Sequence, residues 1–262
     1  MDLLRSGLSA TLPILVAMAV VAGLESFVPL AGRGRGPRSR LAGNLSLSVL
    51  TLVLNLGLNV SFLGLLTRTR FGILHQLELG PVASLVLALL GLDLATWLGH
   101  VGLHKVPLLW RVHCVHHSDP VVDVTTSLRQ HPIETGIRYG VLAAAALLLG
   151  VGPAAFAIYR SVSAGVALLE HANLRVPPRV DDALSWVVTF PGMHKLHHSR
   201  DPRFTDTNYG NVVSWWDRLF ATFTPARLSG GVRYGLEGGD DASLHSACRL
   251  LALPFGRARR RS

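Results

Sequence analysis

Three long apolar stretches restrict the fold of this chain more than any other feature of its sequence. They cover residues 8–30, 44–67 and 82–103, and each is close to the roughly 20 apolar residues that a helix needs to cross a bilayer. Backbone groups inside a membrane must be satisfied by the segment itself, which favours helices. We therefore expect an all-α integral membrane protein with three anchoring spans within residues 1–104.

The composition supports a membrane environment. Hydrophobic residues make up 49% of the 262-residue chain, charged residues make up only 16%, and the mean hydropathy is +0.38, unlike an ordinary soluble domain. The first apolar stretch is longer than the ~7 to 15 residues of a signal-peptide core, and further spans follow it. We therefore interpret it as the first membrane anchor and not as a secretory signal.

A fourth apolar region, residues 135–170, is interrupted in its middle. Gly150, Gly152 and Pro153 break it, which predicts two shorter helices joined as a hairpin that enters the membrane and returns to its starting face. The hairpin belongs to residues 105–225, which we predict to form a helical catalytic cap. A basic tail, residues 226–262, follows the cap.

The net charge is +9, and many of the arginines that contribute to it lie beside the apolar stretches. Four follow the first stretch and four lie near the C-terminus: Arg33, Arg35, Arg38 and Arg40, and Arg257, Arg259, Arg260 and Arg261. The positive-inside rule explains this distribution better than nucleic-acid binding does, so we expect no nucleic-acid partner. The same rule predicts that the loop after the first span, the tail and the histidines described next face the cytoplasm.

Ten of the twelve histidines lie between residues 100 and 198. Eight of them form three clusters, spaced HxxxH, HxxHH and HxxHH: His100 and His104; His113, His116 and His117; His194, His197 and His198. Positions i, i+3 and i+4 of a helix lie on one face, so each cluster can present its imidazoles together. This spacing predicts a metal site, and the number of imidazoles favours two ions.

The other four histidines have no cluster of their own. We expect His171 to be a ligand and His131 to be either a ligand or a residue that supports one, whereas His75 and His245 are expected at the surface. Ligand type alone does not identify the metal, because imidazole binds iron, zinc, copper and nickel.

A carboxylate inside an apolar span needs a partner or a function. Asp93 lies seven residues before His100, two turns away on the same helix face, where it can orient His100 or His104 or bond to a neighbouring span. Glu134 and Glu170, beside the ligand segments, are candidates for the same orienting role.

At these residues the chain resembles the fatty acid hydroxylase and sterol desaturase superfamily of membrane di-iron enzymes. The resemblance extends from Asp93 to about Phe223 and rests on a series of motifs. They are Asp93-xxx-Trp97-xx-His100-xxx-His104, Leu109-Trp-Arg-x-His113-xx-His116-His117-Ser-Asp119, Arg129-x-His131-Pro-x-Glu134, His171-x-Asn173, Pro191-xx-His194-xx-His197-His198-Ser199, Asn208-Tyr-Gly210 and Trp216-Asp-Arg-Leu-Phe220.

The resemblance implies a base of about four membrane helices beneath a cytoplasmic cap that holds two irons, with O2 as co-substrate. It implies hydroxylation or desaturation of an unactivated C–H bond of a lipid, for which iron is suited and zinc is not. The ligands that it implies are the ten histidines from His100 to His198, and the other functional residues are Asp93, Glu134, Asn173 and Asn208. The chain departs from the family at Ala221 and Phe223, where relatives often have Gly and Tyr.

No fused cytochrome domain or flavin fingerprint is visible, so we expect a separate electron donor: a ferredoxin, a cytochrome or a reductase. Two other functions stay open at this point. A His-rich membrane metal transporter would distribute its ligands through several spans, and a membrane zinc hydrolase would need the glutamate of HExxH, which the paired histidines lack. The substrate is open among fatty acyl chains, sterol-like polycyclic lipids, carotenoids and ether lipids.

Overall fold

The computed structural model describes residues 2–30, 38–69, 71–228, 231–239 and 241–256, with side chains from Leu12 onward. Within these ranges the regular secondary structure is helical, and extended pairing is limited to three isolated β-bridges. The prediction of an all-α protein is therefore confirmed.

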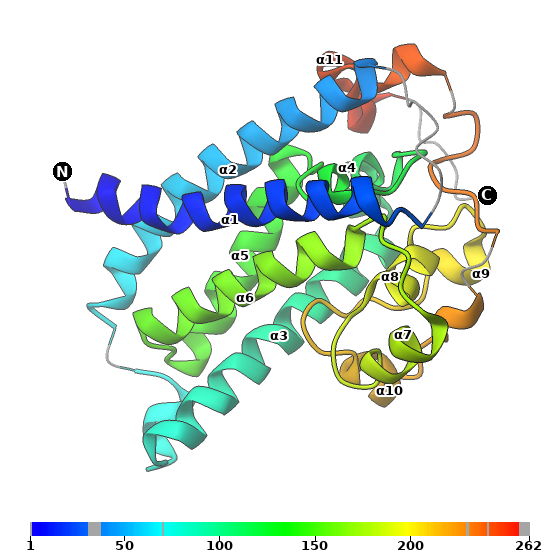
Figure 1. The fold of residues 1–262 in the computed structure, drawn as a ribbon. Helices are drawn as coiled ribbons and strands as arrows, with labels where there is room; N and C mark the ends of the chain where they lie inside the picture. The colour runs from blue at the N-terminus through cyan, green and yellow to red at the C-terminus, as the bar shows by residue number, and fades with distance from the viewer. Residues whose placement is uncertain (1, 31–37, 70, 229–230, 240, 257–262) are drawn as a thin grey trace.

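Five long helices lie side by side and form the body of the molecule (Figure 1). They are α1 (Asp2–Phe27), α2 (Arg38–Leu66), α3 (Pro81–Lys105), α5 (Pro132–Leu149) and α6 (Pro153–His171). Shorter helices gather at one end of this bundle, which we call the cap: α4 (Pro107–His117), α7 (Pro178–Leu184), α8 (Pro191–His197), α9 (Pro202–Thr205), α10 (Trp215–Leu219) and α11 (Ala247–Ala252). Short 3₁₀ turns occur at Ile73–Gln76, Val124–Thr126, Ala226–Leu228, Ala242–His245 and Leu253–Phe255.

Three helices, α2, α3 and α5, are long and apolar enough to cross a membrane, and α1 contributes a shorter apolar stretch, Leu12–Phe27. Their outward faces carry apolar side chains such as Val53 (62% exposed) and Val82 (76% exposed). Water disfavours such continuous apolar surfaces, whereas lipid accommodates them. The helices indicate an integral membrane protein, and the predicted spans coincide with α1, α2 and α3. The sequence prediction treated α5 as one arm of a hairpin, yet by length and composition it is itself a candidate span.

The helices α5 and α6 form the predicted hairpin. α5 ends at Leu149 and is capped by Gly150, whose φ of 75° lies in the left-handed region that favours glycine. α6 begins at Pro153, which suits the first turn of a helix. Consequently α5 begins at Pro132 and α6 ends at His171 at the same end of the bundle (Figure 1). The hairpin thus returns the chain to the cap, as predicted.

An aromatic cluster holds the bundle together below the cap. The ring of Phe62 from α2 lies edge-on to Tyr139 of α5 and Phe156 of α6, with centroid distances of 6.0 and 5.1 Å. Leu92 of α3 is fully buried in the same cluster. Such aromatic pairs add about 0.5–1.5 kcal/mol beyond the burial of their area. This packing fixes the helices that carry the histidines into the cap.

The C-terminal region packs more closely than its sequence predicted. His245 is only 2% exposed, and its ring contacts Nη2 of Arg129 at 3.2 Å and the carbonyl oxygen of Gly239 at 2.9 Å. Leu250 of α11 is buried against α2 and α4. The expectation that His245 is a surface histidine was therefore wrong, because contacts with distant segments enclose it.

Arg40 is the second residue whose surroundings differ from expectation. It is 5% exposed, and its guanidinium contacts Asp119 at 2.5 Å and Asp123 at 3.0 Å. Its charge is thus neutralised inside the protein and is no free membrane-flanking charge. Arg38, in contrast, is exposed, and the flanking arginines at residues 31–37 and 257–262 lie outside the described residues.

Candidate metal centre

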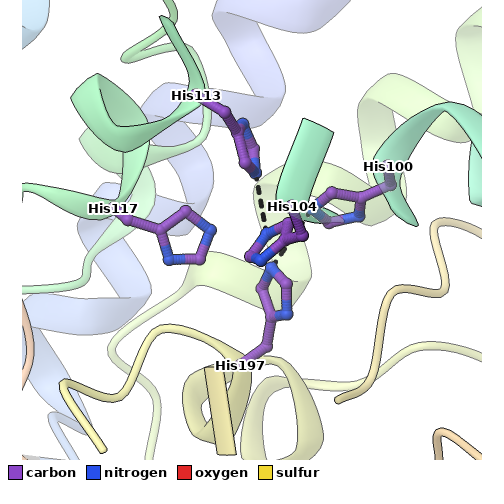
Figure 2. Close-up of side chains that lie close together, drawn as sticks. All are labelled: His100, His104, His113, His117 and His197. Carbon is purple, nitrogen blue, oxygen red and sulfur yellow. Dashed lines mark hydrogen bonds between the residues drawn. The ribbon is translucent and has the colours of Figure 1, made fainter. Parts of the chain in front are cut away.

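Nine of the ten histidines predicted as ligands converge in the cap as two buried groups. The five-histidine group consists of His100 and His104 from α3, His113 and His117 from α4, and His197 from α8 (Figure 2). The four-histidine group consists of His116 from α4, His171 from α6, and His194 and His198 at α8. Within each group the candidate ligand atoms lie within 4.8 Å of one another.

Each HxxHH element contributes to both groups. In α4, His113 and His117 join the five-histidine group while His116 joins the other. At α8 the division is reversed, since His197 joins the five-histidine group and the remaining two histidines join the four-histidine group. The rings of His117 and His198 stack across the boundary with centroids 4.4 Å apart. The two groups are therefore neighbours that share α4 and α8.

The spacing of the ring nitrogens fits metal ligation. Nε2 of His104 lies 3.0 Å from Nε2 of His113, and Nε2 of His171 lies 3.1 Å from the Nε2 atoms of His116 and His194. Two imidazoles that bind one ion at about 2.1 Å and at right angles place their nitrogens about 3 Å apart. Both ring nitrogens of His117 are buried without a hydrogen-bond partner among the described residues. The donor set therefore suits two metal ions.

The opposite nitrogens of several rings face hydrogen-bond acceptors. Nδ1 of His100 donates to the carbonyl oxygen of Tyr209 at 2.9 Å, and Nδ1 of His197 donates to that of Thr207 at 2.7 Å. Because a carbonyl only accepts, the proton resides on Nδ1 and the lone pair of Nε2 points into the group. The cap thus fixes the tautomer that metal binding needs.

Burial keeps these histidines neutral. Burial, followed by the neighbouring imidazoles, lowers the pKa of His116, His117 and His198 well below 6.5. Burial also lowers the pKa of His197 to about 3. A neutral imidazole binds a cation without first releasing a proton. At physiological pH the groups are therefore ready to receive metal.

Two glutamates lie against the histidine groups. Oε1 of Glu134 accepts from Nδ1 of His113 at 2.8 Å, which is the orienting contact that the sequence suggested. Oε1 of Glu170 lies 3.6 Å from Nε2 of His194 and 3.7 Å from Nδ1 of His171. Both carboxylates are buried beside the imidazoles.

The other predicted polar residues organise loops around the centre. Asp93 accepts from the backbone amides of Val212 and Val213 and from Nε1 of Trp216. It therefore bonds to α10 and the segment before it and not to His100 or His104. The hydroxyl of Tyr159 on α6 also donates to Asp93, at 3.1 Å, which agrees with the alternative of a bond to a neighbouring helix. Among the described contacts we find none that joins Asp93 to a histidine.

The two predicted asparagines also hold backbone segments. Asn208, at a φ of 55°, donates to the carbonyl oxygens of Met193 and Thr224 at 2.9 Å. The backbone amide of Asn173 donates to Oε1 of Glu25 at 2.8 Å. Asn208 thus connects α8 to the segment after α10, and Asn173 connects the segment after α6 to α1.

His131 lies apart from both groups. It caps the N-terminus of α5, where its Nδ1 accepts from the amide of Ile133 at 3.2 Å, and its Nε2 lies 3.3 Å from the carbonyl oxygen of Leu251. His131 is therefore the one predicted ligand whose ring nitrogens do not belong to either histidine group.

Asp217 is a buried residue that the sequence analysis named only as part of the Trp216-Asp-Arg-Leu-Phe220 motif. Its carboxylate accepts from the amides of Tyr209 and Gly210 at 2.8 and 2.7 Å and from Nε1 of Trp97 at 3.0 Å. Since the carbonyl of Tyr209 orients His100, Asp217 positions a candidate ligand through the backbone. The spacing of NYG and WDRLF is the only sequence signal for this contact.

A second buried network supports α4 from the other side. Arg129, fully buried, donates to the carbonyl oxygen of Val115 at 3.0 Å and to Oγ of Ser118 at 2.7 Å. Burial alone would raise the pKa of Asp119, but Arg129 and Arg40 lower it below its usual value. The charged carboxylate and the two arginines hold the end of α4 that carries three of the histidines.

A family profile described as fatty acid hydroxylase matches residues 85–222, more than half of the chain. The chain belongs to the fatty acid hydroxylase family. All nine converging histidines lie inside the matched residues, so family and geometry refer to one region. The resemblance drawn from the motifs is thereby confirmed.

The chain is similar to two kinds of curated relative. It is 33% identical to the alkylglycerol monooxygenase of Danio rerio over 152 residues, which are 57% of this chain and 32% of that protein. It is 34% identical to the ornithine lipid hydroxylase OlsE of Rhizobium tropici over 151 residues, which are 56% of this chain and 43% of that protein. The matched part therefore spans less than half the length of either relative. No solved structure matches the chain.

Proposed function

We propose that this chain is a membrane-bound, O2-dependent lipid hydroxylase that holds one iron in each histidine group. The observation that carries the proposal is the pair of adjoining, buried groups of neutral imidazoles at one end of an apolar bundle. Membership of the fatty acid hydroxylase family supports it, as do relatives named as a lipid monooxygenase and a lipid hydroxylase. These names favour hydroxylation over desaturation and point to a lipid substrate.

When bound, a pair of redox-active irons supplies the O2 activation that cleavage of an unactivated C–H bond requires. The role of the protein is to hold the ions and to orient the side chains that bind them. The nine histidines of the two groups would be the ligands, Glu134 orients His113, and the backbone carbonyls of Tyr209 and Thr207 orient His100 and His197. Burial of the cap keeps bulk water from the centre. Electrons are expected from a separate ferredoxin, cytochrome or reductase.

The position of the ligands argues against a metal transporter. A transport path requires ligands spread along the spans, whereas here α3 and α6 contribute histidines from their cap ends and the rest come from α4 and α8. A single zinc for hydrolysis would leave the second group of imidazoles unused.

The experiment loads purified protein with Fe(II) without oxygen and then adds O2, a reductant and a lipid extract. We expect about two irons per chain, O2 consumption and lipid products heavier by about 16 daltons, the mass of one oxygen atom. A loss of about 2 daltons would establish desaturation. Lipid turnover by protein that carries zinc and no iron would overturn the proposal.

We also propose that the cap faces the cytoplasm, on the basis of the arginine distribution. Cys248 in the cap is exposed while Cys114 is buried, so Cys248 is a natural reporter. A membrane-impermeant maleimide should label Cys248 in inverted vesicles and not in intact cells, with Cys248→Ser as the control. Labelling in intact cells would place the cap on the opposite face.

A further inference from the structure

A cavity of about 390 Å³ lies inside the helical bundle, between α2, α5 and α6. One end of it borders the metal centre through three residues. Thr96 is one turn before His100 on α3, Ala167 is one turn before His171 on α6, and Thr135 follows Glu134 on α5. The carbonyl oxygen of Ala167 accepts from Nδ1 of His171 at 2.7 Å, so the cavity wall contacts a ligand directly. A lipid in this cavity would approach the histidine groups from the membrane side.

The cavity wall farther from the cap is unusually polar for a membrane interior. Nη2 of Arg160 donates to Oδ1 of Asn55 at 2.8 Å, and the hydroxyl of Tyr139 donates to Oδ1 of Asn59 at 3.0 Å. The Arg160 guanidinium also lies 5.5 Å from the centre of the Tyr139 ring. Asn55 and Asn59 are one turn apart on α2, so this span presents a polar stripe to the cavity.

The charge of Arg160 has no opposite charge in the described residues. Its partners, Asn55 and Tyr139, are neutral, and its Nε is buried without a hydrogen bond. Arg138, the other cavity cation, lies 3.7 Å from Glu134, while the cavity lining contains no carboxylate. A guanidinium within a bilayer is costly unless it is paired, and such a residue marks a ligand or ion site by default. An anion beside Arg160 would neutralise this unpaired charge.

We propose that this cavity binds a lipid through an anionic headgroup, a carboxylate or a phosphate, held by Arg160, with the apolar chain extended toward the histidine groups. This inference rests on the proposed function, since it names the substrate class of the same centre. Arg160 precedes His171 by eleven residues on α6, which corresponds to about 16 Å along the helix axis. An extended chain needs on the order of a dozen C–C bonds of about 1.5 Å to cover this distance. Oxidation is therefore expected deep in the chain and far from the headgroup.

The test measures binding of three probes with the same chain: hexadecanoic acid, hexadecyl phosphate and hexadecanol. Competition with a fluorescent fatty acid on the purified, iron-loaded protein gives each affinity. A charge-assisted hydrogen bond to Arg160 should make the two anionic probes bind at least about tenfold more tightly than the alcohol. Arg160→Gln should abolish that preference, Arg160→Lys should retain much of it, and Arg249→Gln, at an exposed site on α11, should leave it unchanged.

Equal binding of the alcohol and the acids by the wild-type protein would overturn the inference, and so would an unchanged preference in Arg160→Gln. The wild-type comparison stands even where a variant does not fold. A second measurement uses a fatty acid with a photoreactive diazirine beside its carboxylate. Adducts on the segments around Asn55 and Arg160 are expected, and adducts confined to the cap would contradict the proposed orientation.

Binding and turnover separate this inference from the function on which it rests. Selective binding of anionic probes without any oxidised product would retain the cavity assignment and reject the oxygenase. Oxidation of neutral lipids at equal rates by the wild-type protein and Arg160→Gln would retain the oxygenase and reject the cavity assignment.

Discussion

Replacement of Glu134 tests whether the carboxylates beside the histidines set their affinity for iron. Oε1 of Glu134 lies 2.8 Å from Nδ1 of His113, and neither side chain is exposed to solvent. Such a carboxylate fixes a ligating ring and raises its basicity, and its loss costs about 10- to 100-fold in metal affinity. Glu134→Gln keeps the shape and an acceptor oxygen but removes the charge, so we expect a loss of about tenfold, or about 1.4 kcal/mol. Glu134→Leu removes the acceptor as well, and we expect about 100-fold, or about 2.8 kcal/mol.

The assay is competition between the protein and a chromophoric Fe(II) chelator without oxygen. Glu78→Gln is the matched control, because Glu78 is exposed in the segment between α2 and α3, outside the cap. Helical content by circular dichroism establishes that each variant is folded. A folded Glu134→Leu protein with wild-type iron affinity would refute the reasoning, as would a larger loss in Glu134→Gln than in Glu134→Leu.

Three further predictions test the rest of the cap. His197→Ala and His194→Ala remove ligands from different groups, so each should reduce the iron count from two toward one per chain by metal analysis; loss of both irons from either variant would show that the groups do not fill separately. Arg40→Gln leaves the buried Asp119 with only one of its two arginine partners and should lower the free energy of unfolding by about 3–5 kcal/mol, measured as a lower unfolding temperature in detergent. The double variant Arg40→Gln with Asp119→Asn should recover part of this lost stability. Burial and then Arg129 lower the pKa of His245, so the unfolded chain takes up the proton first and stability is lost as the pH falls below about 6.5. The protection factors of residues 241–256 against hydrogen exchange should therefore fall as the pH drops from about 7.5 to 5.5, and His245→Gln should flatten this change.

The helices of this protein were predictable because the bilayer leaves few alternatives. Continuous apolar sequence predicts α2 and α3, and the break at Gly150 and Pro153 predicts the turn of the hairpin without knowledge of any tertiary contact. The histidine spacing likewise predicts that each cluster lies on one helix face. These are local properties, and local periodicity is sufficient to find them.

The division of each HxxHH element between two groups was not predictable in this way. Periodicity places His113, His116 and His117 on one face, but it does not say which of them meets His197 and which meets His171. That choice depends on how α4 and α8 lie against each other, which is a tertiary property. The same limit explains the wrong expectations for His245 and Arg40, whose partners Arg129 and Asp119 are 116 and 79 residues away in the chain.

The two groups also differ in the charge that surrounds them. Imidazole ligands are neutral, so divalent ions would bring uncompensated positive charge into a buried site, which is costly without nearby anions. In the five-histidine group, Glu134 and Asp206 lie beside the outer Nδ1 atoms of His113 and His104, at 2.8 and 3.4 Å. In the four-histidine group, Glu170 instead lies 3.6 Å from Nε2 of His194, on the side of the ligand nitrogens.

The second oxygen of Glu170, Oε2, is buried without a hydrogen bond among the described residues. The same is true of Oε2 of Glu134, so Glu170 is distinguished by its position beside a ligand nitrogen of the group that has one imidazole fewer. Glu170 and Glu134 thus differ in role although both follow from the same sequence argument. Glu134 acts on its group through the ring of His113, whereas Glu170 is placed to balance the charge of an ion directly. Glu170→Gln should therefore weaken iron binding in the four-histidine group and leave iron binding in the five-histidine group unchanged.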